Sequence, residues 1–456
     1  MSACSGRSTK TSKRARRYRK ISILFTFKGT MSIQYSNDDN QQMVRIDDYD
    51  HPTSPLPLRL FNSVGCLCPS RFPFVDTLLS MAIKRSGGLS NFGDEGFMEP
   101  LSVLVHSLQT EAPLTAFGRF LQKESIVGCL IQRLRLEELY RAHPEICEEC
   151  ISQPIIIAGL PRTGTTHLFN LLSRDDSLHY MPYWETLNPL PEPNEASPDG
   201  RVKVGRQALQ LIGWCMPKFA AFHEFHNDWP HEELQLLTQS FISLSFEAAM
   251  LVPSYSRWYR QADRSPAYAY LKRSLKALQW LRKKEGKTGR RWVLKCPEHL
   301  ANIKHLVEAF PDATFVQTHR DPARIVASMS AMVAYSARMN MKAGTAYDMA
   351  NHWSERTEDL LLASVRDRKL LPEAKNVVDV QFDDFMKDMK GTVRRIFDRA
   401  GHEFTDATDK AIDTFLANNP PGKHGRIDYQ GAMDDLGIVL EERGDALAAY
   451  SEKFGV

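Results

Sequence analysis

Residues 154–172, PIIIAGLPRTGTTHLFNLL, hold a glycine-bearing loop between two apolar segments. The isoleucines at 155–157 are typical of a strand buried on both faces of a parallel sheet, and Leu168, Leu171 and Leu172 follow at helical spacing. In a strand–loop–helix unit, backbone N–H groups and the helix N-terminus point toward one place, where a phosphate can bind. We therefore expect an anion-binding loop over residues 159–166.

The loop is close to a nucleotide-binding G-x-x-x-x-G-K-[ST] motif, but it lacks the lysine. Gly159 and Gly164 occupy the glycine positions, and Thr165 stands where the lysine would contact the outer phosphates of ATP or GTP. The positive charge lies earlier, at Arg162, whose guanidinium can form two parallel hydrogen bonds with an oxyanion. The candidate anion ligands are Gly159, Arg162, Thr163, Gly164, Thr165 and Thr166.

From about residue 75 to its end, the chain resembles the bacterial-type sulfotransferases that use 3′-phosphoadenosine-5′-phosphosulfate (PAPS) and are related to tyrosylprotein sulfotransferases. The resemblance implies an α/β, P-loop-like three-layer fold with a central parallel sheet and a large helical cap or insertion. It also implies that PAPS binds as cosubstrate, with its 5′-phosphosulfate on residues 159–166 and without a metal. The implied reaction transfers a sulfuryl group to a hydroxyl of a small-molecule, lipid or glycan acceptor.

A second basic site is needed for the 3′-phosphate of PAPS. Arg320 follows a predicted strand, and Ser328 lies eight residues further on, a separation that matches the 3′-phosphate pair of the family. The alternative is that Arg320 forms a helix-capping ion pair with Asp321. Lys423 belongs to a basic, glycine-bearing segment that resembles the C-terminal segment of the family, or else to a basic surface loop.

Sulfuryl transfer requires cations near the transferring group and a base for the acceptor hydroxyl. Arg162 and Lys295, which ends the predicted strand RWVLK, are the two expected cations. Glu185, 23 residues after Arg162, is the favoured base, since a glutamate in a comparable place serves the tyrosylprotein relatives. The cytosolic relatives place a histidine two residues after the strand-end lysine, where this chain has Pro297. His231, Glu232 and Glu298 remain alternatives.

The elements that must position these residues alternate between strands and helices, which indicates a parallel sheet covered on both sides. Strands are expected at 178–183, 291–295, 313–319 and 376–380. Residues 1–50 read as a disordered basic tail, 51–70 as irregular, 51–150 as a largely helical cap, and 151–456 as the P-loop-like domain. A helical insertion is expected at about 200–285, with helices at 203–216, at 230–251 capped by Asp228, and at 265–284.

The net charge of +3 is unevenly distributed. Residues 1–30 contain nine Lys or Arg and no acid, which leaves −6 for residues 31–456 and argues against a nucleic-acid partner. No apolar run reaches the length of a membrane span, so no integral membrane association is expected. Eight scattered cysteines, including a Cys147/Cys150 pair without a second pair, are typical of reduced thiols in a cytoplasmic protein.

Two other functions remain at this point. One is a nucleotide kinase or other NTPase with an atypical P-loop, which would need a lysine and a magnesium-binding acid. The other is a non-catalytic nucleotide-binding protein that has kept the fold. The sequence leaves open the identity of the acceptor and the oligomeric state, a homo-oligomer included.

Overall fold

The structure, a computed structural model, describes residues 43–456 except 68–70, 193, 194, 196, 288, 289, 372–375, 421–423 and 441–443. The chain divides into two units, Met1–Asn40 and Gln41–Val456, and the elements below belong to the second. The tail predicted for residues 1–50 lies outside the described residues as far as residue 42. Residues 43–50 belong to the folded structure, because β1 (Met43–Val44) pairs with β7 (Arg426–Ile427) and Ile46 and Tyr49 are buried.

The central sheet has five parallel strands in the order β3-β4-β2-β5-β6. In register, Ile157 lies opposite Lys295 on one side and Val316 on the other. The carboxyl ends of the three central strands therefore lie at one edge, which is the usual position of a ligand site in such sheets. The strands are β2 (Ile155–Ala158), β3 (Leu178–His179), β4 (Arg291–Lys295), β5 (Thr314–His319) and β6 (Val377–Gln381).

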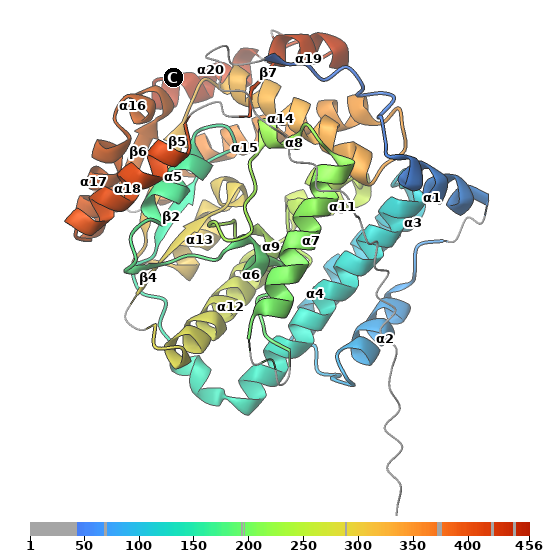
Figure 1. The fold of residues 1–456 in the computed structure, drawn as a ribbon, viewed down its shortest axis with the longest axis horizontal. Helices are drawn as coiled ribbons and strands as arrows, with labels where there is room; N and C mark the ends of the chain where they lie inside the picture. The colour runs from blue at the N-terminus through green and yellow to red at the C-terminus, as the bar shows by residue number, and fades with distance from the viewer. Residues whose placement is uncertain are drawn as a thin grey trace, which may run out of the picture. The chain divides into compact units, whose positions relative to one another are not determined.

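Alternate residues of β2 enter two different apolar cores. Ile155 and Ile157 pack with α5 (Thr165–Leu172), α16 (Phe382–Lys387), α17 (Met389–Ala400) and α18 (Asp406–Asn418). Ile156 packs on the opposite side with α12 (Ser265–Lys284), α13 (Ile303–Ala309), α14 (Pro322–Ser336) and α15 (Ala346–Asp367). The predicted three-layer α/β fold is confirmed, and Figure 1 shows helices on both sides of the strands.

The segment before β2 is helical, with α1 (Leu56–Leu67), α2 (Val75–Arg85), α3 (Met98–Thr110) and α4 (Ala116–Ala142). The sequence does not predict α1, because prolines such as Pro55 and Pro57 are typical of irregular structure. Pro57 lies in the first turn of the helix, where its missing N–H group would have no intrahelical partner, so it does not oppose the helix.

The insertion between β3 and β4 departs from the sequence prediction in its middle. In place of one helix at 230–251 there are α9 (Leu234–Thr238) and α10 (Ser245–Ala249), with Phe241 between them at a φ of 63°. The hydroxyls of Thr238 and Ser240 bond the carbonyls of Leu234 and Leu237, and Ser240 also accepts from the N–H of Ile242. Side chains that bond nearby backbone in this way compete with a continuous helix.

The remaining helices of the insertion are α6 (Tyr183–Leu187), α7 (Asp199–Cys215), α8 (Phe219–Phe222) and α11 (Pro253–Gln261). The C-terminal region adds α19 (Tyr429–Leu436) and α20 (Gly444–Phe454). Short 3-10 helices cover Glu95–Phe97, Pro144–Glu148, Pro297–Ala301, Ala337–Met339 and Arg368–Leu370. Within the described part of the chain, no helix is both long and apolar enough to cross a bilayer.

Candidate active site

The loop between β2 and α5 has two residues in the left-handed backbone region. The φ angle is 75° at Arg162 and 84° at Gly164. A Cβ atom on Gly159 would lie 2.0 Å from the hydroxyl oxygen of Thr318, so only glycine fits there without displacing this neighbour. Left-handed residues in a short loop turn successive N–H groups toward one side, which forms an anion-binding concavity. The positive φ of Arg162, a non-glycine residue, is the kind of strain that gathers at functional sites.

Arg162 is anchored at one end of its guanidinium and free at another atom. Its Nη1 donates a 2.5 Å hydrogen bond to the carbonyl of Phe222, in α8, while its Nε is buried and lacks a hydrogen-bond partner. Arg320 Nη1 donates to the carbonyl of Arg162 at 2.7 Å. Arg320 thus holds the backbone of Arg162, and the Nε–H group of Arg162 remains as a donor for an anion.

The threonines of the loop divide into supporting and accessible side chains. Thr163 is buried, and its hydroxyl donates to the carbonyl of Leu160 at 2.7 Å and contacts the hydroxyl of Thr318 at 2.5 Å. Thr165 is also buried. Thr166, at the start of α5, has its hydroxyl 3.5 Å from Nζ of Lys295. Thr166 therefore links the loop to the strand-end lysine.

Lys295 ends β4 and is only 2% exposed. Its ammonium forms an ion pair with Glu232. Its backbone N–H donates to Glu233 Oε2 at 2.9 Å, and Glu233 Oε1 lies 2.7 Å from Nε2 of His299. The two adjacent glutamates thus hold the side chain and the backbone of the same lysine. A buried cation paired in this way is well oriented and weakly hydrated.

Two histidines of the insertion lie close to these cations. Burial, followed by the nearby charges of Lys295 and Arg162, lowers the pKa of His223 to about 3. Burial, followed by His223 and Lys295, lowers the pKa of His231 well below its usual value. Both rings are therefore neutral near neutral pH. His223 was not predicted, because neither its spacing nor its neighbours in sequence distinguish it from His226.

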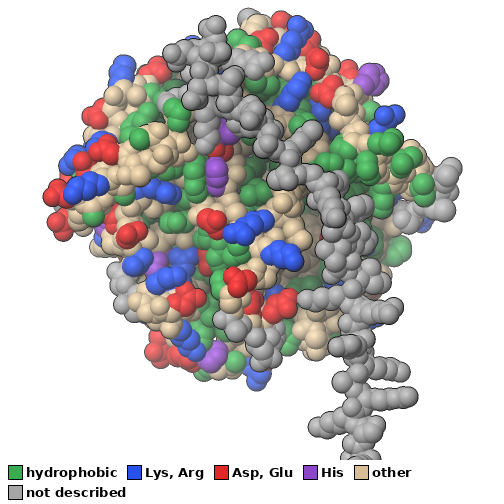
Figure 2. Space-filling view, viewed as in Figure 1, with side chains coloured by type: hydrophobic (Ala, Val, Ile, Leu, Met, Phe, Trp, Pro, Cys, Tyr) green, Lys and Arg blue, Asp and Glu red, His purple; other side chains and the backbone are tan. Residues whose placement is uncertain are grey.

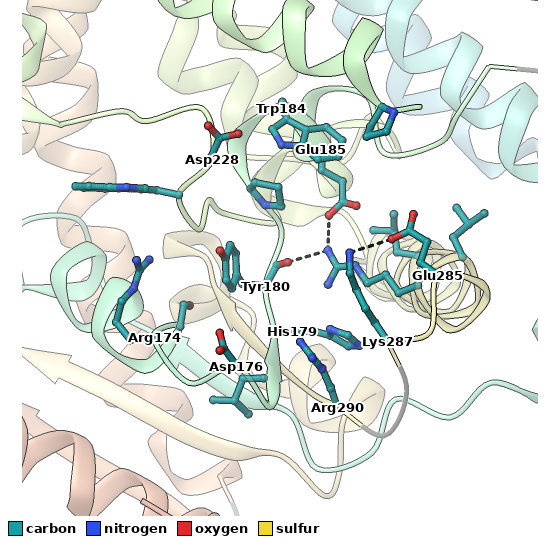
Figure 3. A pocket seen from close by; sticks show the side chains of 18 of the residues that line it. Arg174, Asp176, His179, Tyr180, Trp184, Glu185, Asp228, Glu285, Lys287 and Arg290 are labelled. Atoms are coloured by element: carbon teal, nitrogen blue, oxygen red, sulfur yellow. Dashed lines mark hydrogen bonds and ion pairs between the residues drawn. The ribbon is translucent and has the colours of Figure 1, made fainter. Parts of the chain in front are cut away.

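The favoured base, Glu185, is paired with a different cation. It belongs to α6 and pairs with Arg282 of α12, whose guanidinium also donates to the carbonyl of Tyr180 at 2.8 Å. Both residues line a cleft of about 1010 Å³, and Figure 3 shows the Glu185 side chain in it. The cleft is lined by residues around β3, the end of α12, and α18. The structure therefore brings Glu232, and not Glu185, to Lys295.

Glu298, another alternative base, is fully engaged inside the protein. Its carboxylate accepts hydrogen bonds from Tyr259 at 2.6 Å, from Ser243 at 2.9 Å and from the N–H of Leu244 at 3.1 Å. Burial raises the pKa of this carboxyl. Since all three donors belong to the helical insertion, Glu298 connects that insertion to the segment after β4.

The predicted 3′-phosphate residues lie beyond β5. The Arg320 guanidinium stacks 4.0 Å from the centre of the Phe382 ring, and burial followed by the charge of Arg162 lowers its pKa. Ser328, in α14, is buried, and its hydroxyl lacks a hydrogen-bond partner. Buried polar groups are usually satisfied, so this hydroxyl has capacity for a ligand. Lys423 lies outside the described residues.

Metal ligands do not gather in the described part of the chain. No group of three or more His, Cys, Asp or Glu side chains there is arranged to hold an ion. The charges at the loop come from Arg162, Lys295 and Arg320, with Glu232 as the counter-charge of Lys295. The site thus has protein cations and a carboxylate at the carboxyl edge of the sheet.

The chain is similar in sequence and in structure to several mycobacterial sulfotransferases. The chain is 22% identical over 313 residues to the omega-hydroxy-beta-dihydromenaquinone-9 sulfotransferase Stf3 of Mycobacterium bovis and to that of Mycobacterium tuberculosis, a match covering 65% of this chain and 74% of each relative. It resembles the crystal structure of sulfotransferase STF1 from Mycobacterium tuberculosis H37Rv with a TM-score of 0.69 at 28% identity, over 85% of this chain and 100% of the other. For STF9 from Mycobacterium avium the TM-score is 0.74 at 25% identity, over 84% and 97%.

A family model described as the sulfotransferase family matches residues 154–406, which is more than half of the chain. The match begins immediately before β2 and includes the loop, Glu185, Glu232, Lys295, Arg320 and Ser328. These residues include the cations that the structure gathers at the carboxyl edge of the sheet. The chain belongs to the sulfotransferase family and is a sulfuryl-transferring enzyme.

Proposed function

We propose that this sulfotransferase takes its sulfuryl group from PAPS and transfers it to a hydroxyl of a small-molecule or lipid acceptor. The observation that carries the proposal is a pair of buried polar atoms without partners, Nε of Arg162 and Oγ of Ser328. One belongs to the loop and the other to α14. A donor with an anionic group at each end, such as PAPS, would satisfy both, whereas AMP has only one phosphate.

The transferring group would be held between two cations. Arg162 and Lys295 both lower the pKa of His223, so both lie within electrostatic reach of one ring. In-line transfer spreads negative charge over the sulfuryl oxygens, and fixed cations stabilise that charge without reorganisation. Thr166, next to Lys295, is a further donor for the same oxygens.

We propose Glu232 as the base. The carboxylate accepts the proton of the acceptor hydroxyl as the acceptor oxygen bonds to sulfur, and the bond from sulfur to the phosphate oxygen breaks to release adenosine 3′,5′-bisphosphate. When an anionic sulfuryl group competes for Lys295, the ion pair of Lys295 with Glu232 can open and release the carboxylate. Glu185 and His231 remain the competing candidates, but the first is paired with Arg282 and the second is a weak base because its pKa is lowered.

The acceptor class rests on the curated relatives. Stf3 is named for an omega-hydroxylated dihydromenaquinone, which is a lipid bearing a hydroxyl. At 22% identity this supports a hydroxyl acceptor of small-molecule or lipid type, without selecting a compound. We include glycans in the test set, since a hydroxyl is all that the chemistry requires.

Two measurements test the proposal. Isothermal titration should show that adenosine 3′,5′-bisphosphate binds far more tightly than AMP or ATP, because only the bisphosphate reaches both sites. Equal affinity for AMP would contradict the proposal that the protein binds the 3′-phosphate. Incubation with PAPS labelled in its sulfate, against a library of lipid, phenolic and glycan hydroxyls, should then transfer label to at least one class. Transfer from another sulfate donor, with none from PAPS, would exclude the proposed donor.

A further inference from the structure

Helix α1 is attached to the protein by one side only. Leu58 is buried, and Asn62 Oδ1 accepts a 2.9 Å hydrogen bond from the N–H of Phe117, in the first turn of α4. A Cβ atom on Gly65 would lie 2.2 Å from Cβ of Ala116, so glycine permits the close approach of the two helices. Positions 58, 62 and 65 follow helical spacing and define the inner side of α1.

The outer side of α1 is apolar and uncovered. Leu56, Leu60 and Val64, spaced four residues apart, are 63%, 57% and 65% exposed, and Phe61 beside them is 47% exposed. These four residues are called the α1 face below. A large apolar side chain is ordinarily at least half covered, and a contiguous stripe of exposed ones marks an interaction surface.

The α1 face continues into an apolar groove against the start of α4. The groove has a volume of about 770 Å³, and its aromatic lining consists of Phe61, Phe72 and Phe120. Phe117 packs against two of these rings, with ring centres 6.1 Å from Phe61 and 6.5 Å from Phe120. Figure 2 shows hydrophobic side chains gathered on the side of the molecule where Figure 1 places α1. The α1 face therefore combines protruding apolar side chains with an adjacent apolar groove.

The charged residues that line the groove are basic. They are Arg71, Arg119 and Lys123, and only Lys123 has an acidic partner in the described part of the chain, Glu124, with which it forms a 3.1 Å ion pair. Helix α1 itself contains Arg59 and no Asp or Glu. This is notable in a chain whose residues 31–456 sum to −6. The basic residues lie beside the apolar ones, as lysines and arginines do on helices that lie in a lipid headgroup region.

We propose that the α1 face docks on an anionic lipid bilayer, with the helix lying in the headgroup plane. Leu56, Leu60, Phe61 and Val64 enter the upper acyl region, and Arg59, Arg71 and Arg119 contact lipid phosphates. An apolar surface bordered by these three arginines is complementary to such a bilayer.

Packing also connects the α1 face to residues 159–166, the loop proposed to bind the sulfuryl donor and called the donor loop below. Leu58, on the inner side of α1, belongs to the same apolar cluster as Phe222, whose carbonyl accepts the hydrogen bond from Arg162. The inference does not rest on the proposed reaction, because bilayer binding is measured without donor or acceptor.

The first experiment is sedimentation of the full-length protein with vesicles of phosphatidylcholine alone or mixed with phosphatidylglycerol. We expect binding to the anionic vesicles and little to the neutral ones. Leu60→Ser with Val64→Ser should weaken the partition at least about tenfold, since two branched apolar side chains no longer enter the bilayer. The matched control, Leu362→Ser with Val439→Ser, removes two residues that are 40% and 48% exposed elsewhere and should bind as the wild type does.

The charge component has its own pair of variants. Arg71→Glu should weaken binding to anionic vesicles severalfold, whereas Arg206→Glu, at an exposed position of α7, should have a smaller effect. Depth is measured with Phe61→Trp, whose added fluorescence should shift to shorter wavelength and be quenched by lipids brominated near the headgroup end of the acyl chain. Melting temperatures of all variants should match the wild type, because the substituted positions are exposed.

Three outcomes would overturn the proposal. One is the absence of binding to anionic vesicles. A second is binding that the α1 variants leave unchanged, which would assign it to other basic residues such as the nine at 1–30. The third is a self-associated wild type that Leu60→Ser makes monomeric while vesicle binding persists, which would identify a second copy of the chain as the occupant.

Discussion

This enzyme has two buried carboxylate–cation pairs that can be compared directly. Lys295 pairs with Glu232 at the carboxyl edge of the sheet, and Arg282 pairs with Glu185 beside the edge strand β3. The residue types are alike, and both glutamates are plausible bases from the sequence. The two pairs differ in the other groups that each cation contacts.

Arg282 contacts several groups of the protein. Besides Glu185, it donates to the carbonyl of Tyr180 and stacks 4.6 Å from the centre of the Trp292 ring, so its pair with Glu185 holds α12 against the start of the sheet. Lys295 has the hydroxyl of Thr166 at 3.5 Å, at the base of a loop with an unpartnered arginine Nε. We therefore propose that the Arg282–Glu185 pair is structural (the closed pair), whereas the Lys295–Glu232 pair (the open pair) exchanges its carboxylate for a ligand.

The sharpest test of this difference replaces each glutamate by glutamine. Glu232→Gln should lower turnover by about 10²–10⁴, the usual contribution of a general base. Glu185→Gln should leave turnover within about threefold of wild type and instead lower the melting temperature, since a buried arginine loses its counter-charge. Affinity for adenosine 3′,5′-bisphosphate, measured by titration, should be retained in both. A deep loss of turnover in Glu185→Gln beside a shallow one in Glu232→Gln would reverse the assignment.

The cations give the second test. Lys295→Ala and Arg162→Ala should each reduce turnover by about 10²–10³, as expected for one preorganised donor. Arg282→Ala, the matched change in the closed pair, should reduce stability while turnover per folded molecule stays near wild type. Single-turnover rates at saturating donor separate these effects from binding. Normal turnover in Lys295→Ala would make that lysine structural.

The third test concerns the far end of the donor. Arg320→Ala should weaken binding of adenosine 3′,5′-bisphosphate roughly tenfold to a hundredfold, the cost of about one charge-assisted hydrogen bond. Arg324→Ala serves as the control, because Arg324 lies one turn further along with a 69% exposed side chain. AMP binding should change little in Arg320→Ala if the arginine reads the 3′-phosphate. Equal losses for both nucleotides would indicate that Arg320 acts by holding the backbone of Arg162.

The smallest expected effect is a pH dependence of stability in the region of the closed pair. Burial, followed by the charges of Arg282, Arg290 and Lys287, lowers the pKa of His179 to about 3. In the unfolded chain this histidine takes up a proton near pH 6.5, whereas in the folded chain it does not. The free energy of unfolding is therefore highest above pH 6.5 and falls as pH decreases toward 3.

Urea unfolding between pH 7 and pH 4 measures this effect. His179→Phe retains a ring against Trp292, which lies 5.3 Å away between ring centres, and should show a shallower loss of stability in acid. A similar pKa, lowered to about 3, belongs to His223 near the open pair. Only the contribution of His223 should change when adenosine 3′,5′-bisphosphate is present, because an anion beside it favours its protonated form. An unchanged slope in His179→Phe would place the acid sensitivity elsewhere.

The sheet and its loop could be predicted because their signals are local. The isoleucines at 155–157, the two glycines and the leucines of α5 each follow from neighbours a few residues away, and β4, β5, α12 and α15 follow similar periodic patterns. The break at Phe241 was missed, because it depends on hydroxyls that compete for backbone partners rather than on a glycine or proline.

The environment of Glu185 could not be predicted for another reason. Its partner Arg282 lies 97 residues away, and no spacing along the chain records that contact. The same holds for Lys295 and Glu232, 63 residues apart. Sequence patterns supplied four candidate bases, but a choice among them depends on tertiary pairing. The α1 face was not predicted, because Pro55 and Pro57 argue against a helix at this place in the sequence.

The pairing of β1 with β7 has a consequence for the order in which the protein is made. Met43 is synthesised early, but its partner Arg426 follows 383 residues later, so this ribbon closes only when nearly the whole chain is available. Tyr429, just beyond β7, has its ring centre 5.9 Å from the guanidinium carbon of Arg162. The donor loop thus receives its last neighbour from the final part of the chain. Nascent chains arrested before residue 426 should remain open to protease near residues 43–50 and should lack sulfuryl transfer, so that activity appears only with the finished protein.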